Sequence, residues 1–181
     1  MAKNLSRRLS YVLRHNPGSI GLTADSAGWV GVEELLAGLR ARGRPVDRQQ
    51  LDRCVATNNK QRFEFADDGA RIRARQGHSF QVDLGYAPSK PPPRLFHGTF
   101  PNALASIRDE GLIPRNRHHV HLSADRRTAI EVGARRGRPV LLEVDAFAMA
   151  EAGHTFFVTG NGVWLTDAVP PGFIQSWGDL G

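Results

Sequence analysis

The sequence predicts an α+β protein of two lobes, and two observations carry this prediction. Four prolines and a serine fall within "APSKPPPRL", residues 87–95, which suits neither a helix nor a central strand. Apolar residues recur with helical spacing before this segment, whereas short strand-like runs prevail after it. We therefore expect an N-terminal lobe at residues 1–88, a short stiff linker, and a C-terminal lobe at residues 94–181.

The N-terminal lobe begins with three predicted helices. An amphipathic helix is expected over about residues 3–15, because its apolar residues recur every three to four positions. A short strand at "GWVGV" leads into a second helix over about residues 32–42. Asp47 is a suitable N-cap for a third helix that ends near residue 56.

A β-hairpin is predicted to follow these helices. In "RFEFADDGARIRAR", alternating apolar residues lie on both sides of an Asp-Asp-Gly turn. Helices followed by a two-stranded hairpin are typical of a winged helix. Such modules often bind nucleic acid, although a fold alone does not prove a function.

The C-terminal lobe is expected to be a small α+β unit with several strands. It opens with the strand "RLFHGT" and a helix that starts at Pro101 and ends at Gly111. The other expected elements are a strand at 118–123, a helix at 125–137, a strand at 139–146, two strands around Gly160-Asn161-Gly162, and a closing strand at 172–177.

The positive charge is concentrated in the first half of the chain. Residues 1–90 hold 15 Lys and Arg against 9 Asp and Glu, whereas residues 91–181 hold 9 of each. Arginine, which suits bidentate phosphate contacts, greatly outnumbers lysine. A GC-rich genome would explain arginine over lysine but not the asymmetry. The basic first half indicates a polyanionic partner.

The single cysteine, Cys54, excludes an intramolecular disulfide and a cysteine-based zinc site. No run of 18 apolar residues is present, and the N-terminus lacks the apolar region of a signal peptide. We therefore expect a soluble, cytoplasmic protein without membrane contact.

The stretch "RNRHHVHLS", residues 115–123, is the most unusual of the chain. If it forms a strand, Arg117, His119, His121 and Ser123 share one face, because successive side chains point to opposite sides. A row of donors favours an anionic ligand. Zinc binding by His119 and His121 lacks a third and fourth ligand, and histidines satisfied in a polar strand remain an alternative.

Three further motifs are weak when each is taken alone. "YVLRHNP" places Arg14 and His15 at the end of the first helix, where cations also serve as caps. Arg62 opens the hairpin and could be a solvated charge. "FHGT", residues 96–99, ends a strand with a glycine that could let a ligand approach the backbone. The sequence contains no GxGxxG, P-loop, HExxH or GxSxG motif.

Together and in this order, the motifs resemble the NAD-dependent RNA (tRNA) 2′-phosphotransferase family. The matching elements are "LSYVLRHNP", "RFEF…IRARQGHS", "FHGT", "RHHVHLS", "RRGRPVLLEVDA" and "NGVWLTDAVP", and they cover nearly the whole chain. The resemblance implies an N-terminal winged-helix lobe that binds RNA. It also implies a C-terminal lobe with an ADP-ribosyltransferase-like, NAD-binding fold.

The resemblance also implies a reaction. An internal RNA 2′-phosphate attacks C1″ of the nicotinamide ribose of NAD and expels nicotinamide. In the RNA-2′-phospho-ADP-ribose that results, O2″ displaces the RNA, which leaves with a free 2′-OH, and ADP-ribose 1″,2″-cyclic phosphate forms. A phosphate is already an anion, so the nucleophile needs no general base.

The site residues follow from the same resemblance. The catalytic residues are expected to be Arg14, His15, Arg62 and Arg117. The NAD-binding residues are expected to be His97, Gly98, Thr99, His121, Ser123 and Val163. One position departs from the family pattern: Arg75 stands where Asn is more usual, which leaves RNA contacts at that position open.

The expected partners are NAD as co-substrate and 2′-phosphorylated RNA, with tRNA as one candidate. No metal is expected, and the protein is expected to be a monomer. Three alternatives remain: an ADP-ribosyltransferase that caps terminal phosphates of RNA or DNA, a winged-helix regulator with a ligand-sensing domain, and a module that binds NAD or ADP-ribose without turnover.

Overall fold

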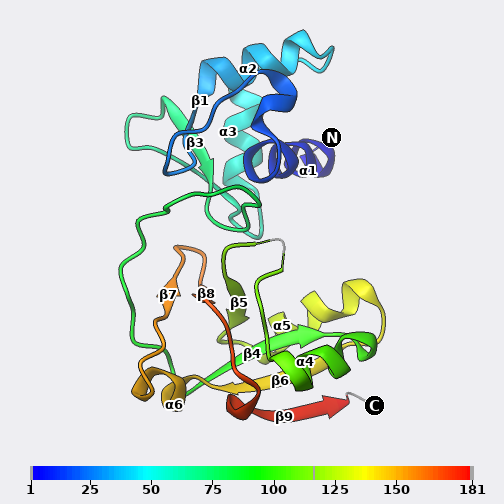
Figure 1. Cartoon of the computed structure of the whole chain (residues 1–181). Helices are drawn as coiled ribbons and strands as arrows, with labels where there is room; N and C mark the ends of the chain where they lie inside the picture. The colour runs from blue at the N-terminus through cyan, green and yellow to red at the C-terminus, as the bar shows by residue number, and fades with distance from the viewer. Residues whose placement is uncertain (1, 116, 180–181) are drawn as a thin grey trace. The chain divides into compact units, whose positions relative to one another are not determined.

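A computed structural model of the chain describes residues 2–115 and 117–179. The chain divides into two compact units, Met1–Gly85 and Tyr86–Gly181, and both combine helices with antiparallel strands (Figure 1). The α+β class predicted from the sequence is therefore confirmed. Among the described residues, no helix is long and apolar enough to cross a membrane.

The N-terminal unit contains three α-helices and a three-stranded sheet in the order β1-β3-β2. Its elements are α1 (Ala2–Arg14), η1 (Pro17–Ile20), β1 (Val30–Gly31), α2 (Val32–Ala41), α3 (Arg48–Ala56), β2 (Phe63–Phe65) and β3 (Arg71–Ala74). The predicted helices and hairpin are all present, with bounds that differ by about one residue. Asp47 caps α3 as expected: its carboxylate accepts from Gln50 N at 2.7 Å, and Gln50 Oε1 accepts from Asp47 N at 3.1 Å.

The core of this unit is formed by the three α-helices and the sheet together. Leu9 and Leu13 of α1 are fully buried, as is Ile72 of β3. Burying each such side chain contributes about 1.5–3 kcal/mol, so α1 is held mainly by packing. This packing fixes the end of α1, where Arg14 lies.

The C-terminal unit contains a six-stranded antiparallel sheet in the order β7-β8-β5-β4-β6-β9. Its strands are β4 (Arg94–Thr99), β5 (Val120–Ser123), β6 (Val140–Asp145), β7 (Phe157–Val158), β8 (Val163–Thr166) and β9 (Ile174–Asp179). Its helices are η2 (Pro101–Ala103), α4 (Leu104–Glu110), α5 (Arg126–Gly133), η3 (Ala134–Arg136), α6 (Ala146–Glu151) and η4 (Pro171–Phe173).

Two features of this unit differ from the sequence predictions. β5 begins at Val120, because the preceding residues bend and Arg115 adopts a positive φ of 44°. The expected strand alternation therefore does not extend back to Arg117. The helix α6 was not predicted. It begins directly after β6, where the Asp145 carboxylate accepts a hydrogen bond from Ala148 N at 2.9 Å.

Candidate active site

Arg14 and His15 lie at the C-terminal end of α1, where the last carbonyl groups of a helix lack intrahelical partners. Ser79, from the segment after β3, supplies one partner: its N–H donates to Arg14 O at 2.8 Å. A second hydrogen bond of 3.1 Å joins Ser79 Oγ to His15 Nδ1. A distant segment therefore fixes both residues of the pair.

Arg62 lies just before β2 and is tied to α1 through a buried amide. Its guanidinium Nη1 donates to Asn58 Oδ1 at 3.3 Å, and Asn58 Nδ2 donates to Ser6 Oγ on α1 at 2.8 Å. Its carbonyl accepts from Arg75 N at 2.9 Å. Ser79 and Arg75, both from the segment after β3, thus form hydrogen bonds with all three predicted residues of this unit.

Arg75, which departs from the family pattern, is oriented by a carboxylate of the hairpin. Glu64 Oε2 lies 3.4 Å from Arg75 Nε, and Glu64 Oε1 accepts from Arg73 Nε at 2.7 Å. Both arginines are mostly buried, with side chains 22% and 12% exposed. Glu64 therefore offsets part of the positive charge of this face.

In the C-terminal unit, Arg117 and His121 are in direct contact. Arg117 Nη1 lies 3.1 Å from His121 Nδ1. An arginine can only donate, so His121 Nδ1 must accept, and the ring proton of the neutral histidine is on Nε2. Although Arg117 precedes β5, its guanidinium still reaches the residue that the sequence paired with it.

His97 of β4 is connected to His121 through its ring nitrogen Nδ1. Its Nδ1 donates to the carbonyl of His121 at 3.0 Å. Burial lowers the pKa of His97, the carbonyl contact opposes this, and the charge of Arg117 lowers it further. His97 is thus neutral near pH 7, with an acceptor lone pair on Nε2.

The structure gives a steric reason for glycine at position 98, which differs from the approach of a ligand to the backbone that the sequence suggested. A Cβ placed there would lie 1.8 Å from Ala129 O and 2.9 Å from Gly133 N, both in α5. The helix therefore occupies the space over the glycine. The neighbouring Thr99 is buried, with 5% exposure. Contact of residues 97–99 with NAD stays a prediction.

Ser123 and Val163 are directly paired on β5 and β8. Ser123 Oγ donates to Asp125 O at 2.9 Å and accepts from Asp125 N at 3.1 Å, so its hydroxyl shapes the turn into α5. Asp125 caps this helix, and hydrogen bonds from the side chain and N–H of Thr128 lower the pKa of its carboxyl. These two predicted residues are therefore brought together at the start of α5.

His119 is engaged with a different part of the unit. Its ring packs edge-on against Phe157 at 5.7 Å, and Nε2 lies 3.7 Å from Asp167 Oδ1. Burial lowers its pKa, which the Asp167 carboxylate partly opposes. Within residues 2–115 and 117–179, no three His, Cys, Asp or Glu residues form a group that could hold a metal ion.

Comparison with known proteins identifies the family. The family model "RNA 2′-phosphotransferase, Tpt1 / KptA family" matches residues 1–168. Proteins named "Probable RNA 2′-phosphotransferase" are 55% identical in Burkholderia lata (96% of this chain, 90% of that protein) and 56% identical in Streptomyces coelicolor (94% and 93%). A protein of that name in Pseudomonas aeruginosa is 55% identical, over 94% of each chain. The chain belongs to the RNA 2′-phosphotransferase family.

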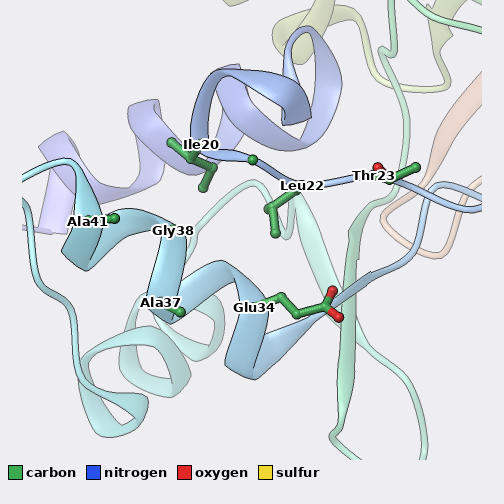
Figure 2. Close-up of a pocket in the computed structure, with 8 residues that line it drawn as sticks. Ile20, Leu22, Thr23, Glu34, Ala37, Gly38 and Ala41 are labelled. Atoms are coloured by element: carbon green, nitrogen blue, oxygen red, sulfur yellow. The ribbon is translucent and has the colours of Figure 1, made fainter.

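One pocket of this RNA 2′-phosphotransferase family member contains none of the predicted residues. It lies between η1 and α2, and Figure 2 shows Ile20 and Leu22 facing Ala37 and Gly38 across it, with the Glu34 carboxylate at one end. Its apolar lining and its carboxylate do not suit a polyanionic substrate.

Sequence reasoning missed the residues that hold the predicted ones in place. Ser79 lies 64 positions from His15, and Asn58 lies 52 positions from Ser6. From the sequence, Glu64 was expected only to be one residue of a hairpin strand. No local pattern links such distant residues; only the position of Ser79 within the family motif "RQGHS" could have drawn attention to it.

Proposed function

We propose that this enzyme transfers an internal 2′-phosphate of RNA to NAD, with nicotinamide, 2′-OH RNA and ADP-ribose 1″,2″-cyclic phosphate as products. The observation that carries the proposal is the family match over residues 1–168, a range that contains every predicted site residue. We also propose that the N-terminal unit is a winged helix that binds RNA. The C-terminal unit is then an ADP-ribosyltransferase-like fold that binds NAD.

The donor chemistry of the N-terminal unit supports the assigned roles. The substrate phosphate is already an anion, so the barrier lies in bringing RNA and NAD, both polyanions, into contact. Arg14 and Arg62 would hold the 2′-phosphate by charge-assisted hydrogen bonds, and His15 would donate or accept beside them. The Arg62 guanidinium already donates to Asn58 Oδ1, which limits the entropy that this side chain loses on binding.

The donor set of the C-terminal unit fits NAD, which presents two phosphates, ribose hydroxyls and an amide. Arg117 and the Nε2–H of His121 are donors suited to oxygen anions, whereas neutral His97 offers an acceptor to a hydroxyl or amide. Arg117 would stay beside the phosphate once it has joined the ribose. In this proposal arginine supplies the positive charge that a metal ion supplies in other phosphoryl-transfer sites.

The direct test uses an oligonucleotide with one internal 2′-phosphate, incubated with the protein in the presence and absence of NAD. We expect phosphate loss only with NAD, together with free nicotinamide and ADP-ribose cyclic phosphate detected by mass spectrometry. An oligonucleotide with only a 5′-phosphate is the control. ADP-ribose that stays attached to the RNA would instead indicate terminal capping, and NAD binding without nicotinamide release would contradict the proposal.

A further inference from the structure

The five residues Arg75–Ser79, directly after β3, contact all three predicted catalytic residues of the N-terminal unit. Arg75 N donates to the carbonyl of Arg62, and Ser79 N donates to the carbonyl of Arg14. This segment therefore connects the start of the hairpin with the end of α1. These two sites are far apart in the sequence.

Gly77 lies against the side chain of Arg14. It adopts a φ of +87°, and a Cβ built there would lie 3.6 Å from Arg14 Nη1 and 3.7 Å from its Cζ. The backbone of this turn thus forms a surface on which the guanidinium rests. The next residue, His78, is 2% exposed and packs edge-on against Phe80, which anchors the turn.

Ser79 completes the arrangement with its hydroxyl. Ser79 Oγ donates toward Arg14 O at 3.4 Å and lies 3.1 Å from His15 Nδ1. With its proton directed to the carbonyl, the oxygen accepts from His15 Nδ1–H. This contact is compatible with neutral and protonated His15, and it fixes the plane of the ring and the direction of Nε2.

We propose that Ser79 is a positioning residue: its hydroxyl orients the His15 ring, and its N–H holds the α1 terminus that presents Arg14. This inference rests on the proposed function, in which Arg14 and His15 contact the migrating phosphate. Ser79 acts through His15, so removal of its hydroxyl should slow the reaction only when His15 is present.

The test compares substitutions of Ser79 in the full chain. Ser79→Ala and Ser79→Val remove the hydroxyl and should lower kcat by about 10- to 100-fold, the range expected when a reacting group loses its alignment. Ser79→Thr restores a hydroxyl at an exposed position and should recover most of this loss. Ser19→Ala is the matched control, because it removes a hydroxyl that donates to Asn16 O at 2.6 Å near the same helix end.

Two readouts separate positioning from a general structural role. The melting temperature of Ser79→Ala should match that of Ser19→Ala. Under single-turnover conditions, Ser79→Ala should add no further loss to His15→Ala, because both changes remove the same function. Equal activity of Ser79→Val and Ser79→Thr, or losses that multiply in the double variant, would overturn the proposal.

A measurement without turnover distinguishes this inference from the proposed function. The ¹⁵N chemical shifts of the His15 ring report which nitrogen carries the proton, and they should change in Ser79→Val but not in Ser79→Thr. If the wild type fails to transfer the phosphate while the shifts respond as expected, the function is wrong and the positioning contact stands. Unchanged shifts in Ser79→Val would refute the contact itself.

Discussion

At the scale of single residues, the C-terminal unit assigns opposite hydrogen-bonding roles to two histidines. Arg117 makes His121 Nδ1 an acceptor, whereas the carbonyl of His121 makes His97 Nδ1 a donor. Both arrangements are satisfied by the neutral rings. Protonation of His97 would place a desolvated charge beside Arg117. The group therefore depends on pH.

His97 gives a prediction for stability at acidic pH. Its pKa in the folded protein is lowered, so below its ordinary value of about 6.5 the unfolded chain binds a proton that the folded chain does not. This contribution to the unfolding free energy is thus fully present above about pH 6.5 and declines as the pH falls; half-buried His119, whose pKa is also lowered, acts in the same direction. Denaturant unfolding at pH 7.5 and 5.5 should show a smaller loss of unfolding free energy for His97→Asn than for the wild-type protein. An equal loss would contradict the assignment.

The two reaction steps should depend differently on the arginines. Arg14→Ala should slow nicotinamide release, whereas Arg117→Ala should slow the second step at least as much as the first and let the ADP-ribosylated RNA build up. Loss of one transition-state donor costs about 10²–10³ in rate. Gel separation of radiolabelled substrate, intermediate and product over time tests this, with exposed Arg135→Ala as the control. Wild-type rates for Arg117→Ala would exclude it from the site.

We also predict that the reaction needs no metal ion. The residues assigned to the phosphate are arginines and a histidine paired with Ser79, and arginine can stabilise the charge that a divalent ion otherwise would. Turnover should therefore be unchanged by EDTA. Loss of activity in EDTA that one specific metal restores would contradict this prediction.

At the scale of elements, the packing of α5 on β4 depends on Gly98. An added Cβ would lie 1.8 Å from Ala129 O, and a backbone atom cannot move aside as a flexible side chain could. Gly98→Ala should therefore destabilise the unit by at least about 3 kcal/mol, the upper range for overpacking. This corresponds to a fall in melting temperature of about 10 °C or more.

The matched control for this change is Gly172→Ala, because a Cβ at Gly172 meets no atom within 4 Å. Both variants add one methyl group to the same unit. Circular dichroism melting curves should separate them clearly. A melting temperature of Gly98→Ala equal to that of Gly172→Ala would show that α5 does not pack on β4 as described.

A comparison of predicted and observed elements shows which structural features local sequence patterns can predict. Periodicity and capping predicted α1 and α3, and the Asp-Asp-Gly turn predicted the hairpin, because these signals lie within a few residues of one another. The start of β5 was predicted too early, since alternation of residue types does not reveal a backbone bend. α6 was missed because its cap, Asp145, also ends a buried strand. Contacts such as that of Ser79 with His15 arise only from tertiary packing.

At the scale of the whole molecule, each unit has its own hydrophobic core. One core runs from Leu9 to Ala74, and the other from Leu95 to Ile174. Separate cores are typical of domains that fold alone. The charges are also unequal: the first unit has 14 Lys and Arg against 9 Asp and Glu, and the second has 10 against 9. The first unit, which has its own core, therefore also carries most of the excess positive charge.

This division predicts that the two functions can be separated. Residues 1–85 alone should bind RNA with an affinity that falls steeply with salt, because neutralising phosphates releases counterions. Residues 86–181 alone should bind NAD but not RNA. Fluorescence anisotropy with a labelled 2′-phosphorylated oligonucleotide, at about 50 and 200 mM salt, measures the first, and calorimetry measures the second. A cooperative melting transition for each fragment is the control for folding. If both folded fragments bound RNA equally at one salt concentration, the charge asymmetry could not be what recruits the RNA.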